Sequence, residues 1–273
     1  MAINLASKYS EKIETIYKRE SFAKGRLNNR VSFVGVRSVN IYTPVTVPLV
    51  DYTRSGANRY GVPTEMQDTK QEMTMTQDKA FSLTIDRGNN IDQLNIKAAG
   101  RMLALQVKEQ AAPLYDQYVF GVLGAGAGTK ITNTAPAAAT IVKRITDGTV
   151  VLDEEEVPEG DRTLFINPKM FAILRLSPEF LGLEKLGTRS LAKGQVGEFD
   201  GMTVVKVPTV RLPAKMNFLI VHKEAATAPI KLNEARIHTD PPGLSGSLLE
   251  GRQYYDCFIF DVKKKGIYAD FTT

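Results

Sequence analysis

The sequence predicts an α+β fold in which an extended β-hairpin and one long helix precede a lobe of mixed strands and helices. Three patterns support this prediction: strand-type alternation over residues 38–50, helical spacing over 91–123, and short strands interleaved with a helix after residue 160. With 273 residues, of which 43% are hydrophobic and 24% charged, the chain is long enough for one large domain or two modest ones.

Residues 1–37 are expected to form a basic N-terminal arm. Leu5, Tyr9 and Ile13 lie near one helical stripe, so a helix is predicted over 7–24. Residues 1–40 contain eight Lys or Arg against three Glu, which equals the whole net charge of +5. Such an arm suits an acidic partner, either nucleic acid or protein, or is a solvated helix with i,i+4 ion pairs. The basic residues assigned to the arm are Lys8, Lys12, Lys18, Arg19, Lys24, Arg26 and Arg30.

Residues 38–90 are expected to contain the extended hairpin. A strand is predicted over 38–50, and Pro44 and Pro48 restrict it to a sheet edge because proline donates no ladder hydrogen bond. A polar, turn-rich stretch over 52–69 leads to a second alternating run over 73–85. A strand of this length spans about 43 Å at roughly 3.3 Å per residue. A two-stranded ribbon is marginal alone in water, so it needs a surface, either its own domain or a neighbouring subunit.

Residues 91–123 are expected to form one long helix. Asp86–Asn90 is predicted as a turn, with Asn90 as the N-cap and Gln93 completing a capping box. At about 1.5 Å per residue the helix reaches roughly 50 Å, with a kink or break at Pro113. The Gly-, Ala- and Thr-rich residues 124–140 that follow are predicted to be a loop or a boundary between lobes.

The remaining sequence predicts a mixed lobe and a pair of closing strands. Strands are expected over 162–168, 201–208 and 218–222, and a short helix over 169–176. The chain then closes with a strand over 253–262, a turn at 263–266 and a strand over 267–271. We find no internal repeat.

The residue types that carry chemistry form no recognisable active site. The run Gly124–Lys130 has the wrong spacing for a phosphate loop, and Gly243–Ser247 lacks the last glycine of a nucleophile elbow. The acidic run 153–156 does not follow a calcium-loop pattern, and His222 and His238 are expected to be structural. We predict no catalytic, cofactor-binding or metal-binding residues and no enzymatic activity. A single cysteine, Cys257, permits no intramolecular disulfide, and no signal peptide or membrane-spanning run is found.

The order of these elements, together with several local sequences, resembles tailed-phage major capsid proteins of the Hong Kong 97-like fold. The local sequences that agree are Asp51-Tyr52-Thr53-Arg54, Arg59-Tyr60-Gly61, Pro113-Leu114-Tyr115-Asp116, Val157-Pro158, Asp161-Arg162-Thr163-Leu164, Asn167-Pro168, Gly251-Arg252-Gln253-Tyr254-Tyr255-Asp256 and Lys265-Gly266-Ile267-Tyr268. Each motif is weak alone, and their order over nearly the whole chain carries the resemblance.

The resemblance implies a domain plan. Residues 1–37 would be the arm, and 38–90 the extended hairpin, or E-loop, with the start of a peripheral domain. Residues 91–123 would be the spine helix of that domain, 124–250 most of a mixed α/β axial domain, and 251–273 the closing strands of the peripheral domain. The hairpin would lie across an adjacent subunit through Arg54, Arg59 and Tyr60 in its loop and Met73 and Met75 on its return strand.

The resemblance also implies a function and partners. Hexamers and pentamers of this chain would form an icosahedral head around double-stranded DNA, assembled in the cytoplasm of a host bacterium and without a membrane. The basic arm would line the inner face. A portal is expected, and because the sequence begins almost at the arm, so is either a separate scaffolding protein or a longer, processed precursor.

Three rival functions remain open from the sequence. An encapsulin-type compartment has the same fold but encloses cargo enzymes instead of DNA. A basic nucleic-acid-binding module predicts salt-sensitive binding by a monomer. A hydrolase that uses the acidic run at 153–161 predicts loss of activity when Glu154 or Glu156 is substituted.

Overall fold

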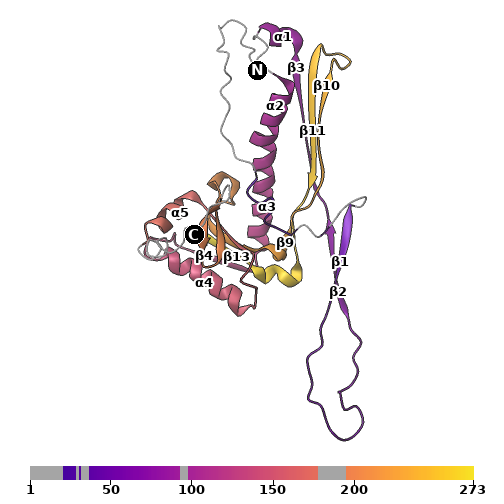
Figure 1. Cartoon of the computed structure of the whole chain (residues 1–273), viewed down its shortest axis with the longest axis vertical. Helices are drawn as coiled ribbons and strands as arrows, with labels where there is room; N and C mark the ends of the chain where they lie inside the picture. Colours follow the sequence, from indigo (N-terminus) through magenta and orange to yellow (C-terminus); the bar gives the residue numbers. More distant parts are fainter. Residues whose placement is uncertain (1–20, 29–30, 32–36, 93–97, 178–194) are drawn as a thin grey trace. The chain divides into compact units, whose positions relative to one another are not determined.

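The computed structural model describes residues 21–28, 31, 37–92, 98–177 and 195–273 and shows the expected mixture of helices and sheets (Figure 1). The chain divides into two compact units. We call Phe33–Met75 the hairpin unit, and Met1–Ser32 with Thr76–Thr273 the body. In the described parts of the chain, no helix has both the length and the apolar character needed to cross a bilayer.

The hairpin unit contains an antiparallel ribbon of two strands, β1 (Ser38–Pro44) and β2 (Asp68–Thr74). Their register runs from the pair Ser38 and Thr74 to the pair Pro44 and Asp68. The first strand is shorter than the predicted 38–50, because it ends at Pro44, which cannot extend the ladder. The long connection over 45–67 contains no strand.

The body begins with a three-stranded antiparallel sheet in the order β10-β11-β3. Its strands are β3 (Gln77–Asp86), β10 (Ile230–Thr239) and β11 (Gly246–Tyr255). The sequence placed residues 77–85 on the returning limb of the hairpin, and this was wrong. They pair with β11 instead, from Gln77 opposite Tyr255 to Asp86 opposite Gly246.

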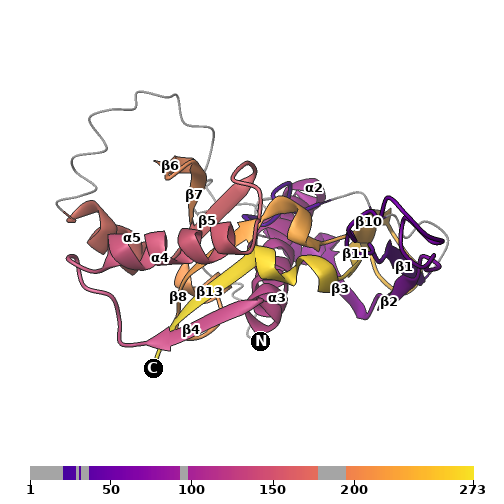
Figure 2. The same cartoon turned by 90° about the horizontal axis from the view of Figure 1, so that it is seen from below.

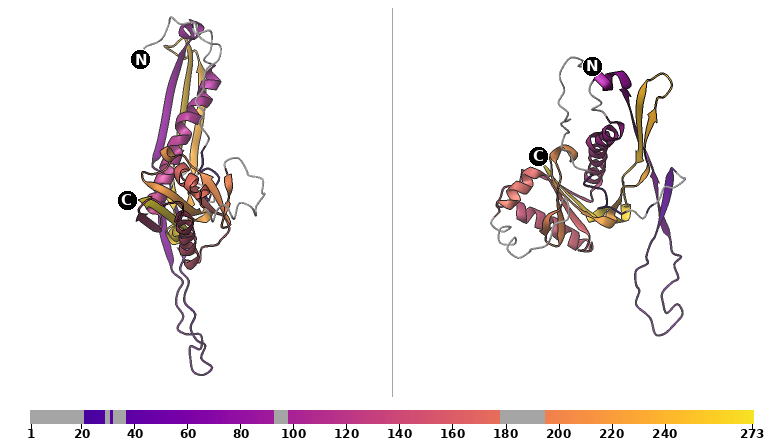
Figure 3. Two further views of the ribbon diagram at one scale, coloured as in Figure 1. Left: turned by 90° about the vertical axis from the view of Figure 1, so that its left-hand side faces the viewer. Right: turned by 45° about the horizontal axis from the view of Figure 1, so that its top comes forward.

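The long helix lies beside this sheet, as two views show (Figures 1 and 3). It consists of α2 (Ala99–Gln106), a π-helical turn η1 (Val107–Ala111) and α3 (Ala112–Gly126). The helix continues through Pro113, which lies in the first turn of α3. In the π turn the Ala112 N–H donates to the Val107 carbonyl, and this wider turn accommodates the proline ring.

A separate short helix, α1 (Arg87–Asp92), occupies the place of the predicted turn. The predicted N-cap at Asn90 was wrong, because Asn90 lies inside α1. Asp86 caps this helix instead, since its Oδ1 accepts from the Asn89 N–H at 3.0 Å. Gln93, the predicted capping-box partner, lies outside the described residues.

The second sheet of the body has six strands in the order β4-β13-β8-β5-β7-β6. These strands are β4 (Thr129–Asn133), β5 (Arg162–Ile166), β6 (Gln195–Phe199), β7 (Met202–Lys206), β8 (Met216–His222) and β13 (Ile267–Thr272). The pairs β4–β13 and β5–β7 are parallel, and the other pairs are antiparallel.

Helices cover both faces of this six-stranded sheet. On one face lie α4 (Ile141–Glu154) and α5 (Pro168–Arg175), whereas α3 lies on the other (Figure 2). Along β5, Leu164 and Ile166 pack in the α4 and α5 core, while Phe165 meets Phe120 of α3 with ring centres 5.0 Å apart. This two-residue alternation builds two cores from one strand.

Short elements complete the body. They are β9 (Ala226–Thr227), which pairs with β12 (Phe258–Ile259), and the 3₁₀ turns η3 (Thr209–Arg211), η4 (Lys223–Ala225) and η5 (Asp261–Gly266). The predicted closing strands do not pair with each other. Residues 253–262 contain the end of β11, β12 and the start of η5, whereas β13 joins the six-stranded sheet. The predicted loop over 124–140 was also wrong in part, because α3 extends to Gly126 and β4 begins at Thr129.

Candidate assembly surfaces and their attachment points

The hairpin unit exposes many large hydrophobic side chains. Leu49 is fully exposed, and Tyr60 is 86% exposed. The exposed set in this unit is Tyr42, Val45, Val47, Leu49, Val50, Tyr52, Tyr60, Val62 and Met66. Among the described residues of the unit, Met73 and Met75 alone are buried hydrophobics. So many exposed hydrophobic side chains within one short unit are typical of an interaction surface.

Local contacts nevertheless give the loop of the hairpin unit a defined course. The Thr53 N–H donates to the Arg59 carbonyl at 3.1 Å, and the rings of Tyr52 and Tyr60 meet edge to face at 4.9 Å. Arg59 Nε donates to the Gly56 carbonyl at 3.3 Å. Gly56 has a φ of 89°, which favours glycine at this turn. The tip is therefore a small folded turn that presents aromatic rings to solvent.

The predicted intersubunit residues fall into two classes. Arg54, Arg59 and Tyr60 are exposed in the loop. Met73 and Met75 are only 1% and 0% exposed within the single chain. The loop residues are thus the members of the predicted set that have free surface to offer to another molecule.

The end of the hairpin unit leads directly to a buried carboxylate, Asp256. Its Oδ2 accepts from the Thr76 N–H at 2.6 Å and from the Thr76 hydroxyl at 2.9 Å. Its Oδ1 accepts from the Tyr118 hydroxyl at 2.6 Å and from the Cys257 N–H at 2.7 Å. Burial, followed by the hydrogen bond to Asp256, raises the pKa of Tyr118 to about 12. Tyr118 therefore remains a proton donor at any physiological pH.

A second buried carboxylate, Asp116 on α3, receives the end of the basic arm. It accepts from the Phe22 N–H at 2.9 Å and from the Ser21 hydroxyl at 2.5 Å. Arg211 pairs with it at 2.7 Å and lies over the Phe22 ring at 5.0 Å. Sequence reasoning missed this site, because Asp116 and its partners are about a hundred residues apart.

The predicted basic arm is described only in part. Lys24 is exposed and Arg26 is half-buried. Lys8, Lys12, Lys18, Arg19 and Arg30 lie outside the described residues. The predicted helix over 7–24 is not seen at 21–24, which form turns, and its remainder is also outside the described residues.

The acidic run at 153–161 is used in ion pairs. Asp153 pairs with the buried Arg162 at 2.7 Å, and Glu155 pairs with Lys265 at 2.5 Å. Within the residues that the structure describes, no cluster of three His, Cys, Asp or Glu is suited to a metal ion. Burial lowers the pKa of His222, whose Nδ1 accepts from the Glu224 N–H at 3.3 Å, and this shift favours the neutral imidazole.

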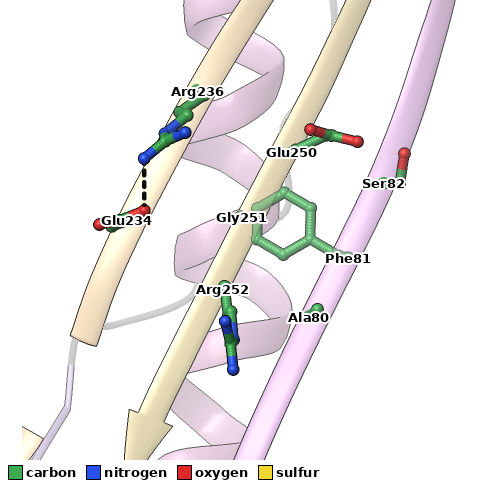
Figure 4. A pocket seen from close by; sticks show the side chains of 8 residues that line it. All are labelled: Ala80, Phe81, Ser82, Glu234, Arg236, Glu250, Gly251 and Arg252. Atoms are coloured by element: carbon green, nitrogen blue, oxygen red, sulfur yellow. Dashed lines mark hydrogen bonds and ion pairs between the residues drawn. The ribbon is translucent and has the colours of Figure 1, made fainter. Parts of the chain in front are cut away.

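The three-stranded sheet carries a shallow depression of about 470 Å³. Ala80, Phe81, Ser82, Glu234, Arg236, Glu250, Gly251 and Arg252 line it (Figure 4). The Phe81 ring lies against Gly251, where a Cβ atom would clash. Arg236 pairs with Glu234 at 2.9 Å, and Arg252 pairs with Asp78 at 2.5 Å. These charges neutralise one another at the surface and form no nucleophile, base and oxyanion set.

No family model and no curated protein matches this sequence. Solved structures match it closely in fold. The structure of Mycobacterium phage Che8 has a TM-score of 0.72 at 18% identity, covering 97% of this chain and 96% of that chain. The capsid of the cyanophage P-SCSP1u has a TM-score of 0.77 at 11% identity, with coverages of 98% and 93%. The mature capsid of bacteriophage PhiM1 has a TM-score of 0.72 at 14% identity, with coverages of 98% and 92%.

The chain therefore has a phage capsid fold, as the sequence predicted. The match extends over nearly the full length of both partners, so it includes the hairpin unit and both sheets of the body. A fold alone does not specify a function, which depends on the surfaces built on it.

Proposed function

We propose that this chain is the major capsid protein of a tailed bacteriophage. In this proposal, copies of the chain form hexamers and pentamers that build an icosahedral head around double-stranded DNA. The observation that carries the proposal is the hairpin unit, which exposes apolar side chains from Tyr42 to Met66 and has little core of its own. The likeness to chains solved in phage capsids supports the same function.

The apolar side chains from Tyr42 to Met66 in the hairpin unit lack burial in the single chain. Apolar surface removed from water contributes about 25 cal/mol per Å², so a fully exposed Leu49 gains nothing until a partner covers it. A second copy of the chain is the partner that is always present at high local concentration. Closed symmetry repeats one such contact many times, and many weak contacts together give a stable shell.

The sheets suggest how the proposed domains divide. We assign the long helix α2–α3 and the sheet β10-β11-β3 to the peripheral domain, and the six-stranded sheet with α4 and α5 to the axial domain. This assignment differs from the ranges expected from the sequence: β10 and the first residues of β11 leave the axial range 124–250, and β13 joins the axial domain. The strand pairing supports this division. The basic arm would face the interior, toward DNA or a scaffolding protein.

Deletion of residues 52–69 tests the proposal. The body keeps both of its cores, so the variant should fold and remain unassembled. Circular dichroism and sedimentation velocity measure folding and size, and electron microscopy detects particles. Intact shells from this variant would show that the hairpin unit is not needed for assembly.

Point variants separate loss of apolar contact from loss of the whole loop. Leu49→Ser with Tyr60→Ser removes two exposed apolar groups and should reduce the yield of particles severalfold at equal protein concentration. Val262→Ser removes an apolar side chain that is 58% exposed on the body and should leave the yield unchanged. Equal yields from both variants would argue against a specific role of the loop.

A further inference from the structure

The four hydrogen bonds to Asp256 come from three separate parts of the chain. Thr76 precedes β3, Tyr118 lies on α3, and Cys257 follows Asp256 itself. The carboxylate is only 2% exposed. Each of its oxygens has its own pair of donors: Oδ2 receives both bonds from Thr76, and Oδ1 receives those from Tyr118 and Cys257.

Thr76 is also the first body residue after the hairpin unit. At the end of that unit its two limbs are joined, because the Met75 N–H donates to the Arg37 carbonyl at 3.1 Å and Arg37 Nε donates to the Met75 carbonyl. Thr76 follows this joint directly, and it makes both hydrogen bonds to Asp256 Oδ2. Whatever restricts Thr76 also restricts the joined base of the hairpin unit.

A buried carboxylate must be hydrogen-bonded in any protein, and Tyr118 with Cys257 would already satisfy much of that need. The two bonds from Thr76 do more than satisfy the carboxylate. They connect Asp256 to the backbone and the side chain of a residue 180 positions away in the sequence. Bonds to a charged acceptor are stronger than neutral ones. This makes Oδ2 a dedicated attachment point for the start of β3.

We propose that Asp256 is a positioning residue for assembly, which holds Thr76 and thereby limits the orientations of the hairpin unit. The proposal rests on the capsid function proposed above. A partner that binds the hairpin unit in one orientation bears the cost of ordering it. Holding its base in advance lowers that cost each time a copy joins a shell.

Two variants test the attachment independently. In Asp256→Asn one carboxylate oxygen becomes an NH₂ group, so the side chain can no longer accept from all four donors. Thr76→Val keeps the amide bond but removes the hydroxyl, which donates to Asp256 at 2.9 Å and accepts from Gln77 Nε2 at 3.1 Å, and Thr76→Ser restores that hydroxyl. In the unassembled chain, exchange of the Thr76 amide hydrogen should rise about tenfold to a hundredfold in Asp256→Asn, as expected for losing bonds to a charged group.

The orientation of the hairpin unit is measured by the distance between two spin labels. Ser55→Cys and Glu159→Cys place them at exposed positions of the two units. Cys257 is 4% exposed and burial raises the pKa of its thiol, so it stays unlabelled. The distance distribution should broaden in Asp256→Asn and Thr76→Val and return to the parent width in Thr76→Ser.

Asp270→Asn is the matched control, because Asp270 is a fully buried carboxylate bonded to Asn217 and Arg144 in the six-stranded sheet. Its distribution should keep the parent width. If Asp256→Asn and Thr76→Val fold and also keep the parent width, the positioning role is wrong. Particle formation by the parent chain is scored separately, so broadened distributions without particles would support the attachment and contradict the capsid function.

Discussion

Buried aspartates join distant segments of this chain at single residues. Asp116 connects α3 to the end of the arm and to η3, and Asp270 connects β13 to Arg144 and Asn217. Burial raises the pKa of Asp270, while the bonds from Asn217 and Arg144 oppose this shift. Each carboxylate loses its hydration on folding, so its partners must supply the compensating bonds.

Asp116→Asn should destabilise the body by about 3 kcal/mol, because it leaves the buried Arg211 charge without its carboxylate. Urea unfolding of the unassembled chain at neutral pH measures this loss. Asp147→Asn is the control: Asp147 pairs with Lys143 on an exposed helix face, and its loss should cost below about 1 kcal/mol. Equal losses in the two variants would mean that burial does not strengthen the Asp116 pair.

For single residues, the sequence predicts hydrogen bonds to partners nearby in the chain and misses those to distant partners. The predicted strand over 162–168 and helix over 169–176 correspond to β5 (Arg162–Ile166) and α5 (Pro168–Arg175). The boundary between them is local, because Asn167 caps α5 by accepting from the Met170 N–H three residues away. Asp256 and Asp116 lie within the motifs of the resemblance, but no spacing in the sequence indicates Thr76 or Phe22 as their partners.

At the scale of elements, the glycine-rich segment after the long helix is the most instructive case. We predicted a loop or a boundary between lobes, yet these glycines lie where neighbouring groups approach closely. A Cβ atom at Gly124 would come within 2.6 Å of Met216, and one at Gly128 within 2.5 Å of the Lys264 carbonyl oxygen. Glycine here allows α3 and β4 to pack against the rest of the body.

Gly128→Ala should therefore destabilise the body by roughly 1–3 kcal/mol, because the clash involves backbone atoms that cannot move aside. Gly160→Ala serves as the control, since a Cβ atom there meets nothing within 4 Å. Chemical unfolding curves of the two variants give the comparison. If Gly128→Ala is as stable as the parent, the close approach at Gly128 is not important, and the prediction of a loop at this position would be supported.

Missed elements have physical explanations as well. Helix α4 contains Gly148, Thr149, Val150 and Val151, all weaker helix formers than alanine. The stripe of Ile141, Ile145, Gly148 and Leu152 was still a readable signal, and Gly148 lies in it because the sheet residues Ile220 and Tyr268 approach there. Strand β13 was predicted over 267–271, but its pairing with β4 and β8 could not be predicted from the sequence.

At the scale of the whole molecule, hydrophobic burial is distributed unevenly. Both large cores lie in the body, around the six-stranded sheet and α3. In the sheet β10-β11-β3, Leu249 and Tyr255 are the buried hydrophobic residues among the described side chains. The resemblance predicted the capsid fold correctly, whereas composition alone indicated no more than a globular chain.

The basic arm gives the prediction at this scale. Replacing Lys12, Lys18 and Arg19 with Gln should lower the DNA content or the yield of particles, because it removes three of the charges available to phosphate. The ratio of absorbance at 260 and 280 nm in purified particles measures DNA content. Replacing Lys79, Lys169 and Lys215, which are exposed on the body, removes the same charge and should have little effect. Unchanged particles from the arm variant would contradict an inward-facing role for the arm.

The position of β13 has a consequence for synthesis on the ribosome. This strand lies between β4 and β8 yet comprises Ile267–Thr272, so the six-stranded sheet lacks an interior member until the final residues of this sequence have emerged. Ribosomes add about 5–20 residues per second, so β13 emerges roughly ten seconds or more after the hairpin unit has been synthesised. The sheet cannot close before then. A chain that stops before residue 267 lacks this interior strand, so under the proposed capsid function it should be degraded and should not enter particles.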